Sequence, residues 1–324
     1  MKKNIAVLAG GYTSERNISL NSGKQVFNSI DRNKYNVYFV DVSRQGLLCE
    51  INPAQFAHID MNDFSVMHNG EKIRFDFAFI VLHGSPGEDG KIQAWLDILQ
   101  IPYSACGVFA SVNTLHKAAC KRLLSNTDVK IPKYVILNNP EAFNIEEILD
   151  ITGLPCFVKP NNAGSSFGVS KVYKKEDLIE AVNIAMQEDN IVIIEEFIKG
   201  TEVSCGVIKT KSEEIVLPVT EIVPKKDFFD TEAKYDPTLT DEITPARISE
   251  EETLAVQSYA SFIYDFIGCK GIVRIDFIIR DGIPYFLEVN SIPGMSAQSI
   301  IPKQIRSIGK NITDILTMII EDNF

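Results

Sequence analysis

Three short, continuously apolar runs stand in the first third of the chain: NIAVLAG at 4–10, NVYFVDV at 36–42 and FAFIVL at 77–82. Strands that are buried on both faces of a parallel sheet show such unbroken runs, whereas half-exposed strands alternate. Each run leads into a glycine- or charge-bearing loop and then into a helical pattern, such as the one at 91–100. The pattern predicts a parallel α/β sheet with ligands at the carboxyl ends of its strands, in the loops at 10–19 and 83–90.

Two further α/β units follow. An amphipathic helical pattern at 116–126 precedes a strand at 155–160, a helix and an apolar strand at 191–198. The last unit holds a helix that opens with the capping-box sequence Ser249-x-x-Glu252, and then a strand, turn and strand at 271–290. We expect three domains, at 1–112, 113–203 and 204–324.

The hairpin predicted at 271–290 carries three oxygen ligands: Asp276, Glu288 and Asn290. Side chains alternate along a strand, so Glu288 and Asn290 share a face, and such hard donors suit Mg²⁺ that also holds phosphates. Directly opposed carboxylates would destabilise a hairpin that had only a structural role. Asp276 joins the same face if the turn has odd length, so we expect a three- or five-residue loop with a bulge and a left-handed Gly282. Arg274 then shares that face.

A glycine- and serine-rich loop follows the strand at 155–160. Gly164 and Gly168 bracket Ser165 and Ser166, so the loop can turn tightly and aim backbone N–H groups at an anion. Such a loop by itself is more often only a turn, and this one lacks the Lys-Ser/Thr of a P-loop. Lys159, at the end of the preceding strand, shifts the interpretation towards phosphate binding.

Several charged residues stand beside apolar strands. Glu195 and Glu196 close one strand, where charges are costly unless they serve something, and Glu202 begins the next. An apolar slot with a carboxylate suits adenine and a pair of ribose hydroxyls. Glu15 either interacts with a helix N-terminus or binds a substrate ammonium, and His83 is either structural or touches a ligand at its strand's carboxyl end.

Two loops in the last third add candidates. The segment PKKDFFDTEAKYD at 224–236 has the length of a lid, and Lys234 and Tyr235 either stay in solvent or reach a site. After the hairpin, the segment at 291–302 places Ser296 and Ser299 near a helix start, which suits a substrate carboxylate.

Composition narrows the class of protein. The 324 residues are 45% hydrophobic, enough for real cores, and the longest apolar runs are far too short to cross a bilayer. The net charge of −11, with both signs interspersed, disfavours nucleic acid and anionic membranes as partners. The first lysines lead straight into an apolar strand rather than a signal peptide, and six scattered cysteines indicate reduced thiols in the cytoplasm.

Together these motifs resemble the D-alanine–D-alanine ligases of the ATP-grasp superfamily, in family order from residue 4 to about 316. The segments that carry the resemblance are GGYTSERNISL, LHGSPGEDGKIQ, KPNNAGSSFGVSKV, EEFIKGTEVS, DTEAKYD, GCKGIVRIDF and FLEVNSIPGMSAQSIIP. The resemblance implies an α/β ATP-grasp fold with an N-terminal parallel-sheet domain and ATP between the central and C-terminal domains. The implied function is the ATP-dependent joining of two D-alanines through an acyl phosphate, for peptidoglycan precursor synthesis, in a cytoplasmic homodimer.

The resemblance also implies roles for the matching residues. The D-alanines and their reacting carboxyl group would be held by Glu15, His83, Arg274, Gly294 and Ser299. ATP would be contacted by Lys117, Lys159, Glu195, Glu196, Glu202 and Lys234. Asp276, Glu288 and Asn290 would hold two Mg²⁺, with Mn²⁺ as a substitute. Ser165 and Tyr235 would link Glu15 to the lid and order the closed site.

Departures from the family pattern leave every charge of this chemistry in place. The family's Met-Asp before Lys117 is Leu115-His116 here, and Gln298 stands where relatives often carry histidine, which bears on the second subsite. Relatives that make D-alanyl-D-lactate lack the lid tyrosine, so Tyr235 favours an amine as the nucleophile.

Three alternatives agree less well with the residues. Another ATP-grasp enzyme would keep the metal strand and Lys159 but lack the Glu15 loop and the sequence EAKY. A nicotinamide-dependent dehydrogenase could use Asp41 after its second strand, but the glycine fingerprint after the first strand is incomplete. A nucleotide-binding module without activity would not need every charged position of the site to be filled.

Overall fold

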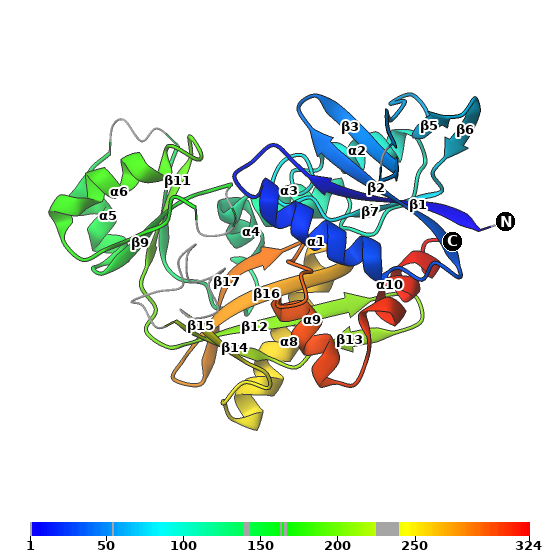
Figure 1. Ribbon diagram of the computed structural model, residues 1–324. Coiled ribbons are helices and arrows are strands. Elements are labelled where there is room, and N and C mark those ends of the chain that lie inside the picture. The colour runs from blue at the N-terminus through cyan, green and yellow to red at the C-terminus, as the bar shows by residue number, and fades with distance from the viewer. Residues whose placement is uncertain (1, 54, 139–142, 163, 165–166, 225–239) are drawn as a thin grey trace.

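The computed structural model describes residues 2–53, 55–138, 143–162, 164, 167–224 and 240–324. Three residues with predicted roles, Ser165, Lys234 and Tyr235, and most of the predicted lid lie outside these ranges. The described chain forms three α/β units, each built on its own sheet. Figure 1 shows the N-terminal sheet above the C-terminal sheet, with the smaller central sheet to one side of both.

The N-terminal sheet is mixed rather than wholly parallel, with the strand order β4-β3-β2-β1-β7. Its strands are β1 (Lys3–Gly10), β2 (Tyr35–Ser43), β3 (Gly46–Asn52), β4 (Gln55–His58) and β7 (Phe77–Ile80). β1 pairs in parallel with β2 and β7, which confirms the three predicted strands. β3 and β4 pair antiparallel, and β3 alternates buried and part-exposed residues because it lies near an open edge. A separate hairpin joins β5 (Ser65–His68) to β6 (Glu71–Arg74).

Four helices lie in this part of the chain: α1 (Arg16–Ser29), α2 (Lys91–Ile98), α3 (Val108–Leu115) and α4 (Lys117–Leu124). α1 follows the loop after β1, and α2 follows the loop after β7. These two loops meet, because Tyr12 N donates to Ser85 O over 3.0 Å. The carboxyl ends of β1 and β7 therefore present their polar residues at one place, as predicted.

The central sheet is antiparallel, with the order β10-β9-β11-β8. Its elements are β8 (Tyr134–Leu137), α5 (Ile145–Thr152), β9 (Cys156–Pro160), β10 (Ser170–Val172), a 3₁₀ turn (Lys175–Asp177), α6 (Leu178–Ala185) and β11 (Val192–Glu196). The two helices bury an apolar face against the sheet, and Ile148 and Leu178 lie in its core. Lys159 and Glu195 leave from neighbouring strands of this sheet.

The C-terminal sheet has the order β15-β14-β12-β16-β17, with β13 also paired to β12. Its strands are β12 (Thr201–Lys209), β13 (Glu214–Val216), β14 (Thr220–Pro224), β15 (Thr240–Ile243), β16 (Gly271–Arg280) and β17 (Ile283–Asn290). The helices are α8 (Glu250–Ile267), α9 (Ile300–Ser307) and α10 (Ile312–Glu321), and the predicted capping box of Ser249 and Glu252 opens α8. None of the helices in the described ranges combines the length and the apolar run that crossing a bilayer requires.

The turn between β16 and β17 corrects the predicted loop length. Arg280 pairs with Ile283, so the turn has two residues, Asp281 and Gly282, with φ of 54° and 77°. Two positive φ values define the hairpin turn whose twist matches its strands. The predicted bulge is present, but within the strand: the pairing shifts after Asp276, and Leu287 is the extra residue of β17. That extra residue restores the parity that an odd loop would have given.

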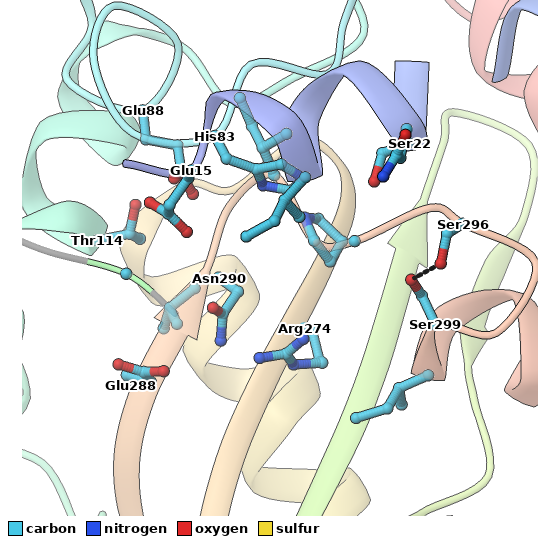
Figure 2. Close-up of a pocket in the computed structure, with 18 of the residues that line it drawn as sticks. Glu15, Ser22, His83, Glu88, Thr114, Arg274, Glu288, Asn290, Ser296 and Ser299 are labelled. Carbon is cyan, nitrogen blue, oxygen red and sulfur yellow. Dashed lines mark hydrogen bonds between the residues drawn. The ribbon is translucent and has the colours of Figure 1, made fainter. Parts of the chain in front are cut away.

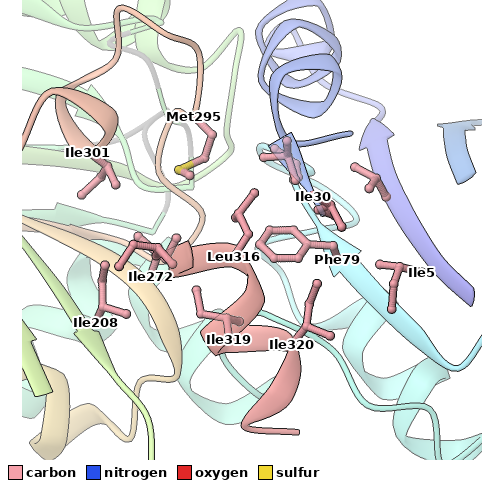
Figure 3. Close-up of a cluster of buried hydrophobic side chains, with 14 of the residues drawn as sticks. Ile5, Ile30, Phe79, Ile208, Ile272, Met295, Ile301, Leu316, Ile319 and Ile320 are labelled. Carbon is pink, nitrogen blue, oxygen red and sulfur yellow. The ribbon is translucent and has the colours of Figure 1, made fainter. Parts of the chain in front are cut away.

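One apolar core joins the N-terminal and C-terminal units (Figure 3). β1 and β7 contribute Ile5 and Phe79, and α10 contributes Leu316 and Ile320. Ile30, the residue directly after α1, packs in the same core. Figure 3 shows the α10 side chains inserted between the N-terminal sheet and Ile208 and Ile272 of the C-terminal sheet. The end of the chain therefore fixes the first sheet against the last one. The division into domains at 112 and 203 stays a prediction.

Candidate active site

The hairpin of β16 and β17 presents four polar side chains on one face, named here the carboxylate face: Arg274, Asp276, Glu288 and Asn290. Asp276 lies directly opposite Glu288, and Arg274 lies opposite Asn290. Arg274 donates from Nε and Nη2 to the two oxygens of Asp276, over 2.9 and 2.8 Å. Asn290 Nδ2 donates to Asp276 Oδ2 over 2.9 Å. The predicted common face is confirmed, and the buried carboxylate of Asp276 has a bidentate cationic partner there.

The donor chemistry of this face fits a divalent ion. Two carboxylates and an amide oxygen are the hard ligands that Mg²⁺ accepts. The face already attracts cations, since Lys117 Nζ lies 3.3 Å from Glu288 Oε2. Among the described residues no group of three or more carboxylate, imidazole or thiol side chains could hold a metal ion, so Asn290 would have to complete the set.

A first cavity, of about 270 Å³, lies between the carboxylate face and the N-terminal unit. Glu15 enters it from the start of α1, and His83 and Glu88 enter it from the loop after β7. Figure 2 shows these three side chains gathered at one end of the cavity, opposite Arg274 and Asn290. The sequence-predicted pair Glu15 and His83 therefore shares a cavity with the carboxylate face.

The polar end of the first cavity is strongly desolvated. Burial lowers the pKa of His83, so its imidazole is neutral, and its Nε2 has no hydrogen-bond partner in the described part of the chain. Burial, and then the charge of Glu15, raise the pKa of Glu88 to about 8. Glu88 Oε2 also accepts from Gly84 N over 2.7 Å, so this carboxyl group holds the loop. A buried, unpartnered imidazole nitrogen beside a cavity is available to a ligand.

Gly164 brings the glycine-rich loop against Glu15. A Cβ atom at residue 164 would lie 2.7 Å from both carboxylate oxygens of Glu15. A larger residue would therefore fit only if the Glu15 side chain or the loop moved. The two motifs lie far apart in the sequence but form adjacent walls of the same cavity.

The other end of the first cavity is formed by the segment after β17. Ser296 Oγ and Ser299 Oγ lie 2.8 Å apart, and Ser299 is the N-cap residue of α9, whose side chain makes no capping hydrogen bond. A Cβ at Gly294 would lie 3.0 Å from Ser299 Oγ. Figure 2 places the two serines across the cavity from Glu15. Hydroxyl groups at a helix N-terminus suit a carboxylate.

A second cavity, of about 410 Å³, lies between the central and C-terminal sheets. Lys159 and Glu196 line it from the central sheet, Glu202 lines it from β12, and apolar side chains such as Phe157 and Ile278 form its walls. Glu196 Oε1 accepts from Lys133 N over 2.8 Å. Lys117, Gly164 and Glu288 line both cavities. The two cavities therefore meet at the carboxylate face.

Glu195 lies among lysines at the floor of the second cavity. Its Oε2 is 2.6 Å from Lys159 Nζ, and its Oε1 is 3.1 Å from Lys121 Nζ. Burial alone would raise the pKa of Glu195, but the two lysines outweigh burial and lower it. That Glu195 and the backbone next to it bind the adenine of ATP stays a prediction. In this structure the carboxylate holds two cations.

The comparisons with known proteins agree with this geometry. Residues 4–106 match the family model described as D-ala D-ala ligase N-terminus, and residues 123–321 match the one described as D-ala D-ala ligase C-terminus. The chain belongs to the D-alanine–D-alanine ligase family. The D-alanine–D-alanine ligase of Bacteroides fragilis is 46% identical over 325 residues, covering 100% of both chains. That of Azobacteroides pseudotrichonymphae is 49% identical over 321 residues, 98% of this chain and 99% of its own.

Solved structures of this family share the fold. The VanG D-Ala:D-Ser ligase of Enterococcus faecalis superposes with a TM-score of 0.86 at 31% identity, covering 100% of both chains. The D-alanine–D-alanine ligase of Bacillus anthracis complexed with ATP gives 0.78 at 29% identity, covering 99% of this chain and 97% of that one. The expected family and the ATP-grasp fold are thus confirmed.

Most of the residues singled out in the sequence line one of the two cavities. The first is lined by Glu15, His83, Arg274, Asn290, Gly294 and Ser299, the second by Lys159, Glu195, Glu196, Glu202 and Asp276, and both by Lys117 and Glu288. The sequence reasoning missed Lys121, whose only signal was its position one turn after Lys117 on an amphipathic helix.

Proposed function

We propose that this protein joins two D-alanine molecules to D-alanyl-D-alanine, converting ATP to ADP and phosphate, for peptidoglycan precursor synthesis. The single observation that supports this most strongly is the meeting of the two cavities at the carboxylate face. One cavity offers polar groups for an amino acid, and the other offers apolar walls and lysines for a nucleotide. The reacting carboxylate and the terminal phosphate would therefore meet beside Asp276, Glu288 and Asn290.

We infer that ATP occupies the second cavity. Lys159 and Lys117 would place point charges on the phosphates, and Glu202 would accept hydrogen bonds from the ribose hydroxyls. Asp276, Glu288 and Asn290 would hold two Mg²⁺, or Mn²⁺. Bound there, these ions would neutralise negative charge on the phosphates of ATP. The roles inferred for Ser165, Lys234 and Tyr235 remain predictions.

We infer that the first cavity binds both D-alanines. Glu15, which is 6% exposed, would accept the ammonium of the first, and His83 Nε2 would lie beside it. Ser299, at the start of α9, would bind the carboxylate of the second. Figure 2 shows Glu15 and Ser299 on opposite sides of the cavity, and Arg274 lines the same cavity.

The inferred reaction has two displacement steps. An oxygen of the first D-alanine's carboxylate attacks the terminal phosphorus of ATP, ADP leaves, and an acyl phosphate forms. The amine of the second D-alanine then attacks the acyl carbon, loses a proton, and phosphate leaves. Arg274 and the Gly294 N–H would stabilise the charge that develops on the acyl oxygens, so catalysis is mainly positioning and charge stabilisation.

An assay of phosphate release tests this function. Mg-ATP is supplied with D-alanine, L-alanine, D-serine or D-lactate in separate reactions, and we expect D-alanine alone to give the dominant stimulation and D-alanyl-D-alanine as product. If phosphate release with D-alanine were no faster than release without any added substrate, the assigned substrate would be contradicted.

A pair of variants tests the site. We expect Glu288→Gln to lower kcat roughly 100-fold or more, because charge stabilisation by a held metal ion is worth several kcal/mol. Glu214→Gln removes a carboxylate from the same sheet that lines neither cavity, and should keep full activity. If Glu288→Gln were as active as the control Glu214→Gln, the assignment of Glu288 to the active site would be contradicted.

We further propose that the protein is a cytoplasmic homodimer. The six cysteines are all free and five are buried, which suits a reducing compartment.

The neighbouring helices α2 and α3 expose Ile98, Phe109 and Val112, with Ile98 80% exposed, as a dimer contact would need. Light scattering of the protein and of Phe109→Glu tests this: we expect a dimer that the variant weakens, and a monomeric unsubstituted protein would contradict it.

A further inference from the structure

Lys121 is a fully buried lysine that the proposed reaction does not use. Its side chain is 0% exposed, and it leaves α4 one turn after Lys117, on the same face of the helix. Its Nζ lies 5.5 Å from the centre of the Phe286 ring. A lysine is rarely taken out of water unless its charge has partners, because desolvation of an ammonium is costly.

The partners of Lys121 lie on both walls of the second cavity. Its Nζ is 3.1 Å from Glu195 Oε1, which belongs to the central sheet. It also donates over 3.3 Å to the carbonyl oxygen of Leu287, the extra residue of the bulge in β17. A bulge leaves a backbone group outside the ladder, and Lys121 satisfies this one.

Glu195 in turn holds Lys159. Glu195 Oε2 lies 2.6 Å from Lys159 Nζ, and the side chain of Lys159 is 13% exposed at the cavity. Glu195 thus shares one charge between a buried cation and a cation that faces the cavity. Without the buried cation, Lys159 would be the only ion-pair partner of Glu195 among the described residues. Lys159 would then be bound to the carboxylate more strongly and would be less available to a phosphate.

We propose that Lys121 is a positioning residue for nucleotide binding. It acts through Glu195, which sets the position of Lys159 and how available the Lys159 ammonium is to a phosphate. The Leu287 carbonyl anchors Lys121, Lys121 balances one oxygen of Glu195, and the other oxygen of Glu195 holds Lys159 at the cavity wall. The inference rests on the proposed function, because it takes the second cavity as the ATP site.

The test uses the full-length protein and Mg-ADP as the probe, with its Kd measured by calorimetry. Lys121→Met keeps the length and apolar stem of the side chain and removes its charge. We expect Kd for Mg-ADP and KM for ATP to rise about 10- to 100-fold, by analogy with the loss of a partner behind a metal ligand, with KM for D-alanine within about threefold. Lys209→Met is the matched control, because Lys209 also bridges two acidic side chains, Glu214 and Asp265, but lines neither cavity.

The control should bind Mg-ADP as the unsubstituted protein does. An unchanged Kd in a folded Lys121→Met protein, or an equal loss in Lys209→Met, would overturn the proposal. Failure of the unsubstituted protein to bind Mg-ADP would instead overturn the proposed nucleotide site.

A double variant separates positioning from a general structural role. If Lys121 acts through Glu195, Lys121→Met should change the Kd for Mg-ADP by less than about threefold in a Glu195→Gln background. This comparison also serves if Lys121→Met alone fails to fold, because the double variant leaves no unbalanced carboxylate buried at residue 195. A further loss of about tenfold or more in that background would show independent action and overturn the proposal.

Discussion

Glu88 shows how one part-buried carboxyl group can make the stability of the protein depend on pH. It lies in the first cavity near Glu15, where burial, and then that neighbouring charge, raise its pKa to about 8. Its usual value of 4.5 applies in the unfolded chain. Between pH 4.5 and about 8, Glu88 is therefore protonated in the folded state but ionised in the unfolded state. Its contribution to the free energy of unfolding is fully present below pH 4.5 and is lost as the pH rises through about 8.

We predict that Glu88→Gln removes this decline. Urea unfolding at pH 6 and pH 9 should show that the unsubstituted protein loses free energy of unfolding relative to the variant, by at least about 1 kcal/mol between the two pH values. The control Glu214→Gln should run parallel to the unsubstituted protein, because the pKa of Glu214 is lowered by Lys209 and its titration lies below pH 6. Parallel curves for Glu88→Gln as well would contradict the prediction.

Single residues were predictable where a local pattern fixes their direction. Alternation along β17 was enough to place Glu288 and Asn290 together, and the cost of charge beside an apolar strand singled out Glu195. Lys121 was not predictable, because its role depends on Glu195 and Leu287, which reach it only after two sheets have packed. The sequence shows the face of the helix but not what covers it.

At the scale of elements, the hairpin of β16 and β17 depends on its two-residue turn. Both turn residues have positive φ, and a Cβ at Gly282 would meet no atom of the described residues within 4 Å. The glycine is therefore there for its backbone conformation and not for space. The predicted loop length was wrong because a bulge can restore parity anywhere along the strand, and the sequence does not say where.

We predict that Gly282→Ala lowers the free energy of unfolding by about 1 kcal/mol, the cost of a left-handed residue with a Cβ. Gly282→Asn should lose less, since asparagine tolerates this conformation. Thermal and urea unfolding of both variants measure the difference. Two equal losses would mean that the side chain, and not φ, is responsible.

At the scale of the molecule, the shared core couples the first and last units of the chain. Leu316 on α10 is fully buried in the cluster that also holds Ile5 and Phe79 of the N-terminal sheet. The sequence indicated three α/β units, but a helix near the C-terminus that packs on the first sheet could not be read from local periodicity. The central sheet has a separate core, which contains Leu178.

We predict that the N-terminal sheet unfolds together with the C-terminal unit. Trp95, the only tryptophan, lies on α2 and packs on Phe64, so its fluorescence reports the N-terminal unit. Leu316→Ala should lower the free energy of unfolding measured by this probe by about 2–5 kcal/mol, the usual cost of a buried leucine truncated to alanine. Leu178→Ala makes the same truncation at a fully buried position in the central core, and should leave the Trp95 transition nearly unchanged. A Trp95 transition that ignores Leu316→Ala, or that follows both variants equally, would mean that the cores are not coupled in the way their contacts require.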